Sequence, residues 1–417
     1  MRLSVCRVGV GPWCELWGCG RADKAILVAE AEALATLLLS GTTGYSSRIL
    51  ALSRQAVGGR RLTDFFEIDF LDVEAKSSGD AICIRYELNG QTFIHVVDGG
   101  YQSTGEKVIN FLNKYYGSPK RIDHIVATHN DGDHAGGLQR VLEDCEVGVL
   151  WMLRPWVFAA ELLPRFKRFT TADGLEKALR EAYSNLAALE EIALRKNIPI
   201  YAPFQGSTIG AFRVMAPTRS RFLDLILSSD KTPQEKGLLE MARDAAVRVA
   251  KEAVALAKAA WGHEYFPAGE TSNENEMSVV QYAYLNGCKI LLTADTGRTG
   301  LKEVIDYAPL AGLTLPGIDR FQVPHHGGRH NVSTDLLDQL LGEKKAAQGG
   351  KTTFTAVISA AEADEDHPRK SVVRAMHHRG AHVISTEASN KRTSKNAPQR
   401  DDYSAADCLP YPDEQED

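Results

Sequence analysis

The sequence lacks the features that mark several classes of protein. No uninterrupted apolar run approaches the roughly 20 residues that a membrane-spanning helix needs, so a membrane channel is excluded and no membrane partner is expected. No internal repeat is present, and 44% hydrophobic with 24% charged residues is an ordinary globular composition. Collagen, a long coiled coil and disorder throughout are therefore excluded, and the 417 residues leave room for two or three domains or one enlarged domain.

Cysteines are few and irregularly spaced. There are seven, an odd number, and Cys14 and Cys19 have no matching second pair that would complete a zinc ribbon. A disulfide framework is therefore not expected, and a reducing compartment, the cytoplasm, fits better.

An excess of basic charge is also missing. The formal net charge is −6, but seven acidic residues and no basic one lie in residues 401–417, and without them the chain has a net charge of +1. The nearly neutral charge of residues 1–400 does not indicate binding to nucleic acid. We predict that residues 391–417 form a polar, acidic and disordered tail.

Strands and helices alternate from about residue 64 onward. Apolar patterns and turn signals predict strands over residues 65–73, 81–88, 92–97, 121–128, 278–285, 289–293, 321–323, 354–359 and 382–385. Helical spacing predicts helices over residues 106–116, 135–142, 174–197, 233–260 and 371–379. This alternation predicts an α/β sandwich with buried sheets, and residues 150–270 are its most helical part.

Four side chains that commonly bind metals lie within six residues. The segment THNDGDH (residues 128–134) follows an apolar strand and contains His129, Asp131, Asp133 and His134. A loop between a strand and a helix directs such side chains into one crevice at the end of a sheet, and imidazole with carboxylate suits zinc, manganese or iron. A helix N-cap explains one aspartate, but not two histidines and two aspartates in alternation.

Two later strands also end in residues of this type. The strand before residue 293 leads to Asp295, and the strand over residues 321–323 leads to His325 and His326. Each of these alone fits a turn or a surface position. Because ligands gather at the carboxyl ends of strands, three such strand ends in one chain predict a shared metal centre.

The segments together resemble the metallo-β-lactamase-fold hydrolases. Residues 129–134 resemble the signature loop of that superfamily, in the variant with aspartate in place of the second histidine. The closest resemblance is to the hydrolase domain of the bacterial DNA-uptake competence channel protein and its soluble relatives, whose membrane-spanning part is absent here. Further resembling segments follow in order at residues 70–73 with 79–81, 97–100, 275–278, 292–295, 325–327 with Ser333, and 358–359 with 367–368.

The resemblance implies a four-layer αβ/βα sandwich with a largely helical insertion and a metal crevice. It divides the chain into a leader of uncertain order at residues 1–63, a hydrolase domain at 64–390 with the insertion region at 150–270, and the tail at 391–417.

The resemblance also implies a set of ligands for one or two divalent ions, zinc or manganese. His129 and Asp131 would hold one ion, Asp133 and His134 with His325 or His326 would hold the other, Asp295 would bridge them, and Asp98 would orient the histidines from behind. The superfamily often supplies another histidine before the bridging aspartate. Here that interval holds only His263, in the predicted insertion, so the first of the two sites is poorer in ligands.

The chemistry expected of such a centre is hydrolysis by a metal-bound hydroxide, because a bound ion lowers the pKa of water to near neutrality. Asp131 or Asp133 would accept a proton, and His367 would donate one or contact the substrate. Arg298 and Arg329 are candidates to neutralise a phosphate.

Three functions stay open at this point. The first is a phosphodiesterase, with nucleic acid or a small phosphodiester as substrate. The second is a hydrolase of a small ester, lactone, lactam or phosphocholine ester, with residues 150–270 shaping the pocket. The third is a catalytically silent interaction module that kept the fold.

Overall fold

The structure, a computed structural model, describes residues 64–232 and 256–416. Contacts within the chain place a boundary after Leu62. The leader at residues 1–63 and most of the helix predicted over residues 233–260 lie outside the described residues.

The first sheet contains seven strands in the order β15-β1-β2-β3-β4-β5-β6. Their bounds are β1 Phe66–Phe70, β2 Ile82–Leu88, β3 Gln91–Val97, β4 Ile122–Ala127, β5 Val147–Met152, β6 Ile200–Tyr201 and β15 Lys391–Lys395. Strands β1, β2 and β3 are antiparallel neighbours, and β3 to β6 run parallel. The parallel half therefore brings the carboxyl ends of β3 and β4 to one edge, where the signature loop begins.

The second sheet also contains seven strands, in the order β14-β13-β12-β11-β10-β8-β7. Their bounds are β7 Thr208–Ile209, β8 Phe212–Ala216, β10 Val280–Leu285, β11 Cys288–Leu292, β12 Arg320–Gln322, β13 Phe354–Ile358 and β14 Ala381–Ser385. Strands β11 to β14 are parallel, so the loops after β11 and β12 also leave from one edge.

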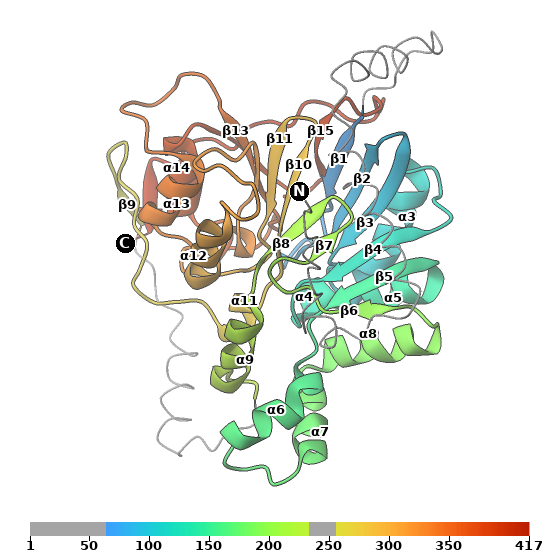
Figure 1. The fold of residues 1–417 in the computed structure, drawn as a ribbon. Coiled ribbons are helices and arrows are strands. Elements are labelled where there is room, and N and C mark those ends of the chain that lie inside the picture. Colours follow the sequence, from blue (N-terminus) through green and yellow to red (C-terminus); the bar gives the residue numbers. More distant parts are fainter. Residues whose placement is uncertain (1–63, 233–255, 417) are drawn as a thin grey trace, which may run out of the picture. The chain divides into compact units, whose positions relative to one another are not determined.

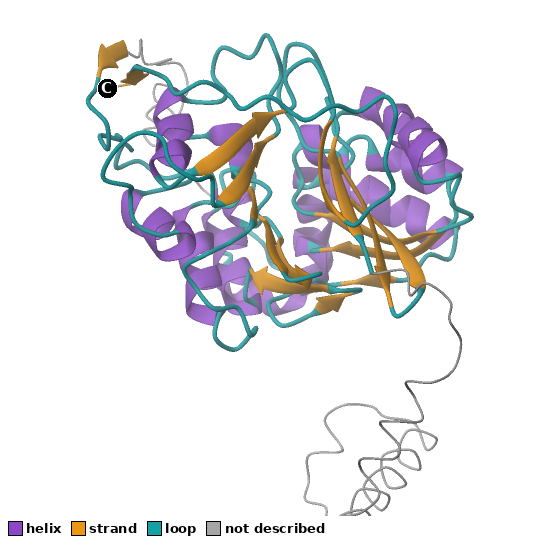
Figure 2. Cartoon of the chain, turned by 90° about the horizontal axis from the view of Figure 1, so that it is seen from above, coloured by secondary structure: helices purple, strands orange, loops and turns teal. Residues whose placement is uncertain are grey.

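Helices cover the outer face of each sheet, as Figure 1 and the view from above in Figure 2 show. The first sheet is covered by α3 Gly105–Tyr115, α5 Leu138–Asp144 and α8 Ser184–Arg195, and the second by α12 Arg298–Tyr307, α13 Thr334–Leu341 and α14 Lys370–His378. The predicted four-layer αβ/βα sandwich is confirmed.

Local sequence explains where these helices begin and which face they bury. Thr171, Thr218 and Ser333 precede α7 (Ala172–Ala182), α9 (Arg219–Ser228) and α13, and each side chain accepts a hydrogen bond from the first helical turn. In α3, Val108, Phe111 and Leu112 are buried on one face at helical spacing.

The region predicted as a helical insertion, residues 150–270, is part of the sandwich rather than an addition to it. It does contain helices: α6 (Ala159–Leu162), α7, α8 and α9. However, β6 extends the first sheet, and β7 and β8 extend the second. These strands are two to five residues long, too short for a periodic pattern to reveal.

Two helix predictions in this region also need correction. The helix expected over residues 174–197 is two helices, α7 and α8, divided at Tyr183, whose φ of −111° and ψ of 52° are not helical. The end of the helix expected over residues 233–260 is instead strand β9, Leu256–Lys258, which pairs with β16, Glu414–Glu416.

The prediction that residues 391–417 form a disordered tail is wrong for the described residues, which end at 416. Strand β15 pairs with β1, and Arg400 then contacts two buried carboxylates of β1, with 2.8 Å to Asp69 and 2.7 Å to Glu67. Because a buried charge is costly without a partner, these carboxylates bind basic side chains of the C-terminal segment. At its end, Glu416 accepts hydrogen bonds from the first two backbone N–H groups of α14.

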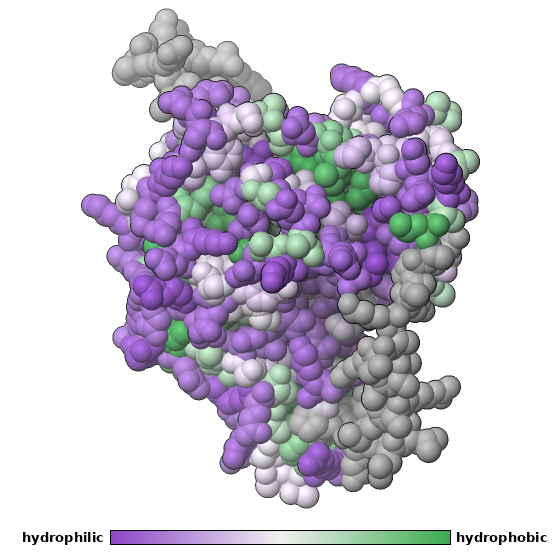
Figure 3. All heavy atoms as spheres, turned by 180° about the vertical axis from the view of Figure 1, so that it is seen from behind, coloured by the Kyte–Doolittle hydropathy of each residue, from purple (hydrophilic) through white to green (hydrophobic). Residues whose placement is uncertain are grey.

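No helix among residues 64–232 and 256–416 is long and apolar enough to cross a membrane. The face drawn in Figure 3 is mostly hydrophilic with scattered apolar spots. The exposed large apolar side chains are spread over the described chain rather than gathered: Val157, Leu194, Tyr201, Leu256, Tyr265, Tyr284 and Leu310.

Candidate metal centre

The signature loop connects β4 to the short helix α4, Gly132–Ala135. Asp131 is the N-cap residue of this helix, although its side chain makes no capping hydrogen bond. His129 and His134 are buried, with side-chain exposures of 1% and 0%, whereas Asp131 and Asp133 are 31% and 25% exposed. The loop thus has two buried imidazoles and two carboxylates nearer to solvent.

The second sheet contributes the other side of the centre. Asp295 follows β11, and His325 and His326 form a tight turn after β12. Ala294, His325 and His326 all have positive φ, at 46°, 49° and 54°, and so does Asp98 in the first sheet, at 57°. Left-handed backbone is uncommon for such residues and concentrates at functional sites, where the surrounding structure holds it in place.

Close backbone contact fixes the signature loop against the end of β3. A Cβ atom on Gly137 would lie 2.0 Å from the carbonyl oxygen of Gly99. The Gly99 N–H donates to the carbonyl of His134 at 2.7 Å, and the Gly137 N–H donates to the carbonyl of Gly100 at 2.9 Å. Glycine at position 137 therefore permits the approach that brings His134 next to Asp98.

Asp295 lies at the middle of the cluster. Its Oδ1 is 3.3 Å from Nε2 of His134. Its Oδ2 is 3.7 Å from Nε2 of His325, 3.8 Å from Nε2 of His326 and 3.9 Å from Nε2 of His129. Two ligands of one small divalent ion lie about 3–4 Å apart, because each is roughly 2 Å from the ion. These separations therefore fit donors that surround a common ion.

Four groups of three side chains have donor atoms near enough together for a metal ion. They are His129 with His134 and Asp295, Asp133 with His134 and His326, Asp80 with Asp295 and His326, and Asp80 with Asp98 and His134. Among the described residues, four donor atoms of these groups have no hydrogen-bond partner: Nε2 of His129, of His134 and of His326, and Oδ1 of Asp295. Buried polar atoms are nearly always paired, so unpaired atoms that converge on one point fit a bound cation.

In three histidines of the centre, His134, His326 and His325, the other ring nitrogen, Nδ1, has a hydrogen-bond partner. Nδ1 of His134 lies 2.9 Å from Oδ2 of Asp98, Nδ1 of His326 lies 2.8 Å from the carbonyl of Ser359, and Nδ1 of His325 lies 3.0 Å from Oδ1 of Asn331. With these acceptors Nδ1 carries the proton, and Nε2 presents a lone pair to the centre.

The charges of the cluster shift its pKa values strongly. Burial alone would raise the pKa of Asp295, but the neighbouring His134, His326 and His325 lower it well below its usual value. Burial alone would lower the pKa of His326, but Asp295 and Asp133 raise it to about 9. Without an ion, His326 is therefore protonated on both ring nitrogens, and a metal ion has to displace the proton on Nε2.

Asp80 belongs to the centre, and the sequence pattern did not assign it a role. It is 1% exposed, its Oδ2 accepts a 2.8 Å hydrogen bond from Nε2 of Gln322, and burial raises its pKa. The available signal was its position: Gly79 and Asp80 lie in a segment that resembles the superfamily. The carboxylate reaches the centre because β2 is antiparallel to β3, so that β2 begins at Ile82 beside Val97, the last residue of β3.

Two of the predicted site residues have other neighbours. Arg298 donates through Nε to the carbonyl of Val332 at 2.7 Å and through Nη2 to the carbonyls of Pro267 and Arg329 at 2.8 and 3.2 Å. These contacts hold the loop after the histidine pair, and the predicted contact of Arg298 with a phosphate stays a prediction. Asp131 forms an ion pair with Lys231 and belongs to none of the four groups.

The remaining predicted site residues are His367 and Arg329, and His263 is the histidine that was not expected to align with the missing ligand. The His367 ring lies 5.3 Å from the ring of His325 and 5.9 Å from that of His326, and its Nδ1 is 3.3 Å from Asp364. Arg329 is only 5% exposed, so its contact with a phosphate stays a prediction. His263 pairs with Gln415 at the C-terminal end and does not complete the centre.

Four side chains of the cluster form a side that is partly open to solvent. The exposed side carries Asp131, Asp133, His325 and His367, whose side-chain exposures are 31%, 25%, 30% and 21%. Behind His129, a cavity of about 10 Å³ is lined mainly by apolar and aromatic side chains such as Leu153, Phe222 and Met277, too small for more than one water. A substrate therefore has to approach from the side of the exposed carboxylates.

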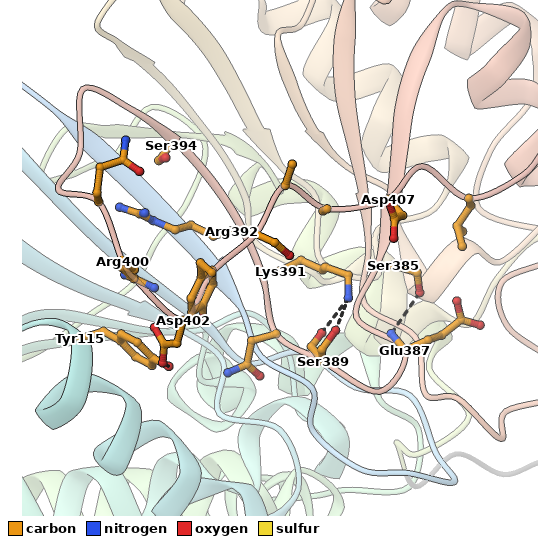
Figure 4. Close-up of a pocket in the computed structure, with 17 residues that line it drawn as sticks. Tyr115, Ser385, Glu387, Ser389, Lys391, Arg392, Ser394, Arg400, Asp402 and Asp407 are labelled. Atoms are coloured by element: carbon orange, nitrogen blue, oxygen red, sulfur yellow. Dashed lines mark hydrogen bonds between the residues drawn. The ribbon is translucent and has the colours of Figure 1, made fainter.

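A larger pocket, about 690 Å³, lies elsewhere and contains none of the predicted site residues (Figure 4). It is lined by Tyr115 and by residues 385–409, including Lys391, Arg392 and Arg400. Arg392 and Arg400 are already paired with Glu67. The pocket therefore owes its polar lining to contacts that stabilise the C-terminal segment.

Comparison with known proteins found a family model and a solved structure that are similar to this chain. Residues 83–182 match the model of the Metallo-beta-lactamase superfamily. A solved structure described as hydrolase AbOPH in the beta lactamase superfamily shares 10% sequence identity, with 62% of this chain and 90% of that chain covered and a TM-score of 0.31. No curated protein matches this chain.

The match of residues 83–182 to this superfamily agrees with the described fold, and the predictions of the fold class and of a hydrolase enzyme are confirmed. The superfamily usually binds divalent metal ions, and the histidine and aspartate cluster provides donors of the required kind. The relationship to the competence protein stays a prediction.

Proposed function

We propose that the protein is a metal-dependent phosphodiesterase, with a small phosphodiester or nucleic acid as its substrate. The observation that carries the proposal is the convergence of unpaired buried atoms from His129, His134, His326 and Asp295 at the ends of three strands. A cation fits this arrangement, and a substrate with an anionic group fits the open side, where Lys231 lies beside Asp131.

The proposed ligands of the better-supplied ion site are Asp133, His134, His326 and Asp295, and zinc or manganese suits this mixture of imidazole and carboxylate. A divalent ion bound there would lower the pKa of a water molecule and polarise the scissile phosphoryl oxygen. Asp98 holds His134 in the orientation that faces the ion.

Two exposed side chains are placed to move protons. Asp133 is 25% exposed and can accept the proton of the attacking water. His367 stands on the open side with Nδ1 toward Asp364, so its other ring nitrogen is available to protonate the leaving oxygen. We assign His367 the role of proton donor and Asp364 the role of holding its ring.

The protein is proposed to act in the cytoplasm. Within the described residues, Cys83, Cys145, Cys288 and Cys408 are free thiols rather than disulfides. Such usage of cysteine is typical of a reducing compartment.

A substrate panel tests the proposal. Protein stripped of metal and reloaded with zinc or manganese is assayed on bis(p-nitrophenyl) phosphate, single-stranded DNA, p-nitrophenyl acetate, a lactone and a β-lactam, with Asp295→Ala as the inactive control. We expect turnover of at least one phosphodiester, and none after Asp295→Ala. Turnover of only the ester, lactone or lactam would instead establish the alternative, a hydrolase of small carboxylic substrates.

A further inference from the structure

Lys231 lies on the open side of the candidate metal centre, in the loop that follows α9. Its ammonium group forms an ion pair with Oδ1 of Asp131, a residue 100 positions away in the sequence. The other oxygen of Asp131 is 3.9 Å from Nε2 of His129. A positive charge therefore already stands beside the two side chains that the resemblance assigns to one of two metal ions.

The start of the loop that contains Lys231 is fixed by contacts with the short helix α11, Asn273–Glu276. Ser229 is 1% exposed, and its hydroxyl donates to Glu274, a 5% exposed residue of α11. The N–H of Lys231 donates to the hydroxyl of Ser229 at 3.1 Å. Asn273 donates to the carbonyl of Ser228 at 2.6 Å. The ammonium group is thus held over the centre by buried contacts of its own loop.

The same short helix joins this loop to the metal centre. Shortly after α11, the hydroxyl of Ser278 lies 3.4 Å from Nδ1 of His129. Within α11, Nδ2 of Asn275 lies 3.5 Å from Nδ1 of His325. Residues 273–278 therefore contact the loop of Lys231 as well as His129 and His325. The position of the ammonium group is fixed by the same segment that supports the two histidines.

The donors are unequally divided between the two ion positions. Asp133, His134 and His326 form one group of donors, and Asp295 lies 3.3 Å from Nε2 of His134 and 3.8 Å from Nε2 of His326. With Asp295 this position has four candidate ligands, the number that a tetrahedral ion needs. Around the other position, among the described residues, His129 and Asp295 form a group only with His134, which also belongs to the first set, while Asp131 is paired with Lys231. Two ligands of this kind do not hold a divalent ion firmly.

We propose that the centre binds one divalent ion and that the ammonium group of Lys231 takes the place of a second. In this position it neutralises Asp131 and offers hydrogen bonds to an anionic oxygen of the substrate. An ammonium group serves as a point charge for phosphate, and preorganised cations stabilise charge that develops during reaction. This inference rests on the proposed phosphodiesterase function and adds a residue that selects an anionic substrate.

Metal stoichiometry tests the first half of the proposal without any assay of activity. Purified full-length protein, stripped of metal and equilibrated with excess zinc or manganese, is measured by elemental analysis after removal of free ion. We expect one ion per chain in the wild type, one in Asp131→Asn, and a second, weaker ion in Lys231→Met. The matched control is Lys302→Met, which removes a lysine paired with Asp306 on α12 and should keep one ion.

Two results would overturn this half. A wild type with two ions, of which Asp131→Asn loses one, would show that Asp131 is a metal ligand and that Lys231 stands elsewhere. One ion in both the wild type and Lys231→Met would show that the ammonium group does not occupy an ion position. A wild type with no ion at all would contradict the proposed function itself, so the two failures are distinguishable.

Kinetics test the second half. With bis(p-nitrophenyl) phosphate, Lys231→Met should raise KM by about 10- to 100-fold, the usual range for a lost hydrogen bond to a charged group. Lys231→Arg should retain most of the affinity, and Lys302→Met all of it. An unchanged KM in Lys231→Met would contradict the assigned contact with the substrate.

Discussion

Two buried clusters of carboxylate and imidazole groups lie in this fold, and they differ in whether their polar atoms are paired. In the metal centre, Nε2 of His134 has no partner among the described residues, although its Nδ1 is held by Asp98. In a second cluster, formed by Glu264, Thr334, Asp338, His378 and Arg379, His378 uses both ring nitrogens. Its Nδ1 lies 2.8 Å from Glu264, and its Nε2 accepts the Gly262 N–H at 3.1 Å.

The carboxylates show the same difference. The oxygens of Glu264 accept hydrogen bonds from Thr334 at 2.8 Å and from Arg379 at 2.9 and 3.1 Å. Asp295, equally buried, has an oxygen without a hydrogen-bond partner in the described part of the chain. The two clusters contain similar residue types, so their composition does not distinguish them. The cluster whose buried polar atoms all have hydrogen-bond partners stabilises the fold, whereas the cluster with unpaired atoms is suited to bind a ligand.

The largest effect that separates the two clusters is expected from Asp295→Ala. Loss of the central carboxylate should abolish metal binding and lower kcat/KM on the substrate by at least about 10³-fold, because a metal ion contributes several kcal/mol to the transition state. The fold should persist, as measured by circular dichroism. Metal content by elemental analysis is the direct measurement, and retention of the ion would contradict a central role for Asp295.

Glu264→Ala should act in the opposite way. It leaves the buried guanidinium of Arg379, whose side chain is 0% exposed, with only Asp338 as a charged partner. We expect the free energy of unfolding to fall by about 3 kcal/mol, as for other broken buried ion pairs. Urea denaturation measures this, and the metal content should stay that of the wild type. A lost ion would show that the two clusters are coupled.

Asp98→Asn should have an intermediate effect that is confined to the metal centre. The amide keeps the size of the side chain but no longer favours the His134 tautomer that has its lone pair on Nε2. We expect metal affinity to fall by about 10- to 100-fold, as for other residues that support a metal ligand. Competition with a fluorescent chelator measures it. Asp338→Asn, in the paired cluster, is the matched control and should leave metal affinity unchanged.

The smallest effect is a difference in pH dependence. Burial alone would raise the pKa of Glu264, but hydrogen bonds from His378 and Arg379 lower it from 4.5 to about 2. The carboxylate therefore stabilises the folded state fully above its unfolded pKa, and this contribution is lost as pH falls through the window between these two values. Glu264→Gln should show a shallower loss of stability there, measured by urea denaturation across that window. Equal slopes would contradict the assignment.

Local sequence was enough to predict the chemical core of the centre. The strands before residues 128, 293 and 324 have apolar patterns that local reading recognises, and each is followed by metal-binding residue types. Because parallel strands share an edge, Asp295 and His326 could be expected to lie together, as could His129 and His134 in one loop. That the two pairs meet across the two sheets followed only from the resemblance. Sequence could not predict the hydrogen bonds of Arg298 to the carbonyls of Val332, Pro267 and Arg329, because proximity to Asp295 in the sequence does not determine where a long side chain points.

Sequence reading was weakest where contacts join distant positions. Glu67 and Asp69 in β1 form ion pairs with Arg392 and Arg400 of the C-terminal segment. This segment has the composition of a disordered tail, yet it contains the edge strand β15. The composition of residues 391–417 is polar in either case. Only the buried carboxylates of another strand decide whether ordering the segment is favourable.

What the sequence alone determined is therefore an α/β sandwich, its longer strands and the types of ligand at their ends, because these follow from periodicity over a few residues. What only the tertiary structure decided is which polar atoms are paired. It placed Asp80 in the centre, set Lys231 against Asp131, and left the Nε2 atoms of three histidines facing one point. The physical reason is that pairing and burial depend on neighbours that lie up to hundreds of positions away in the chain.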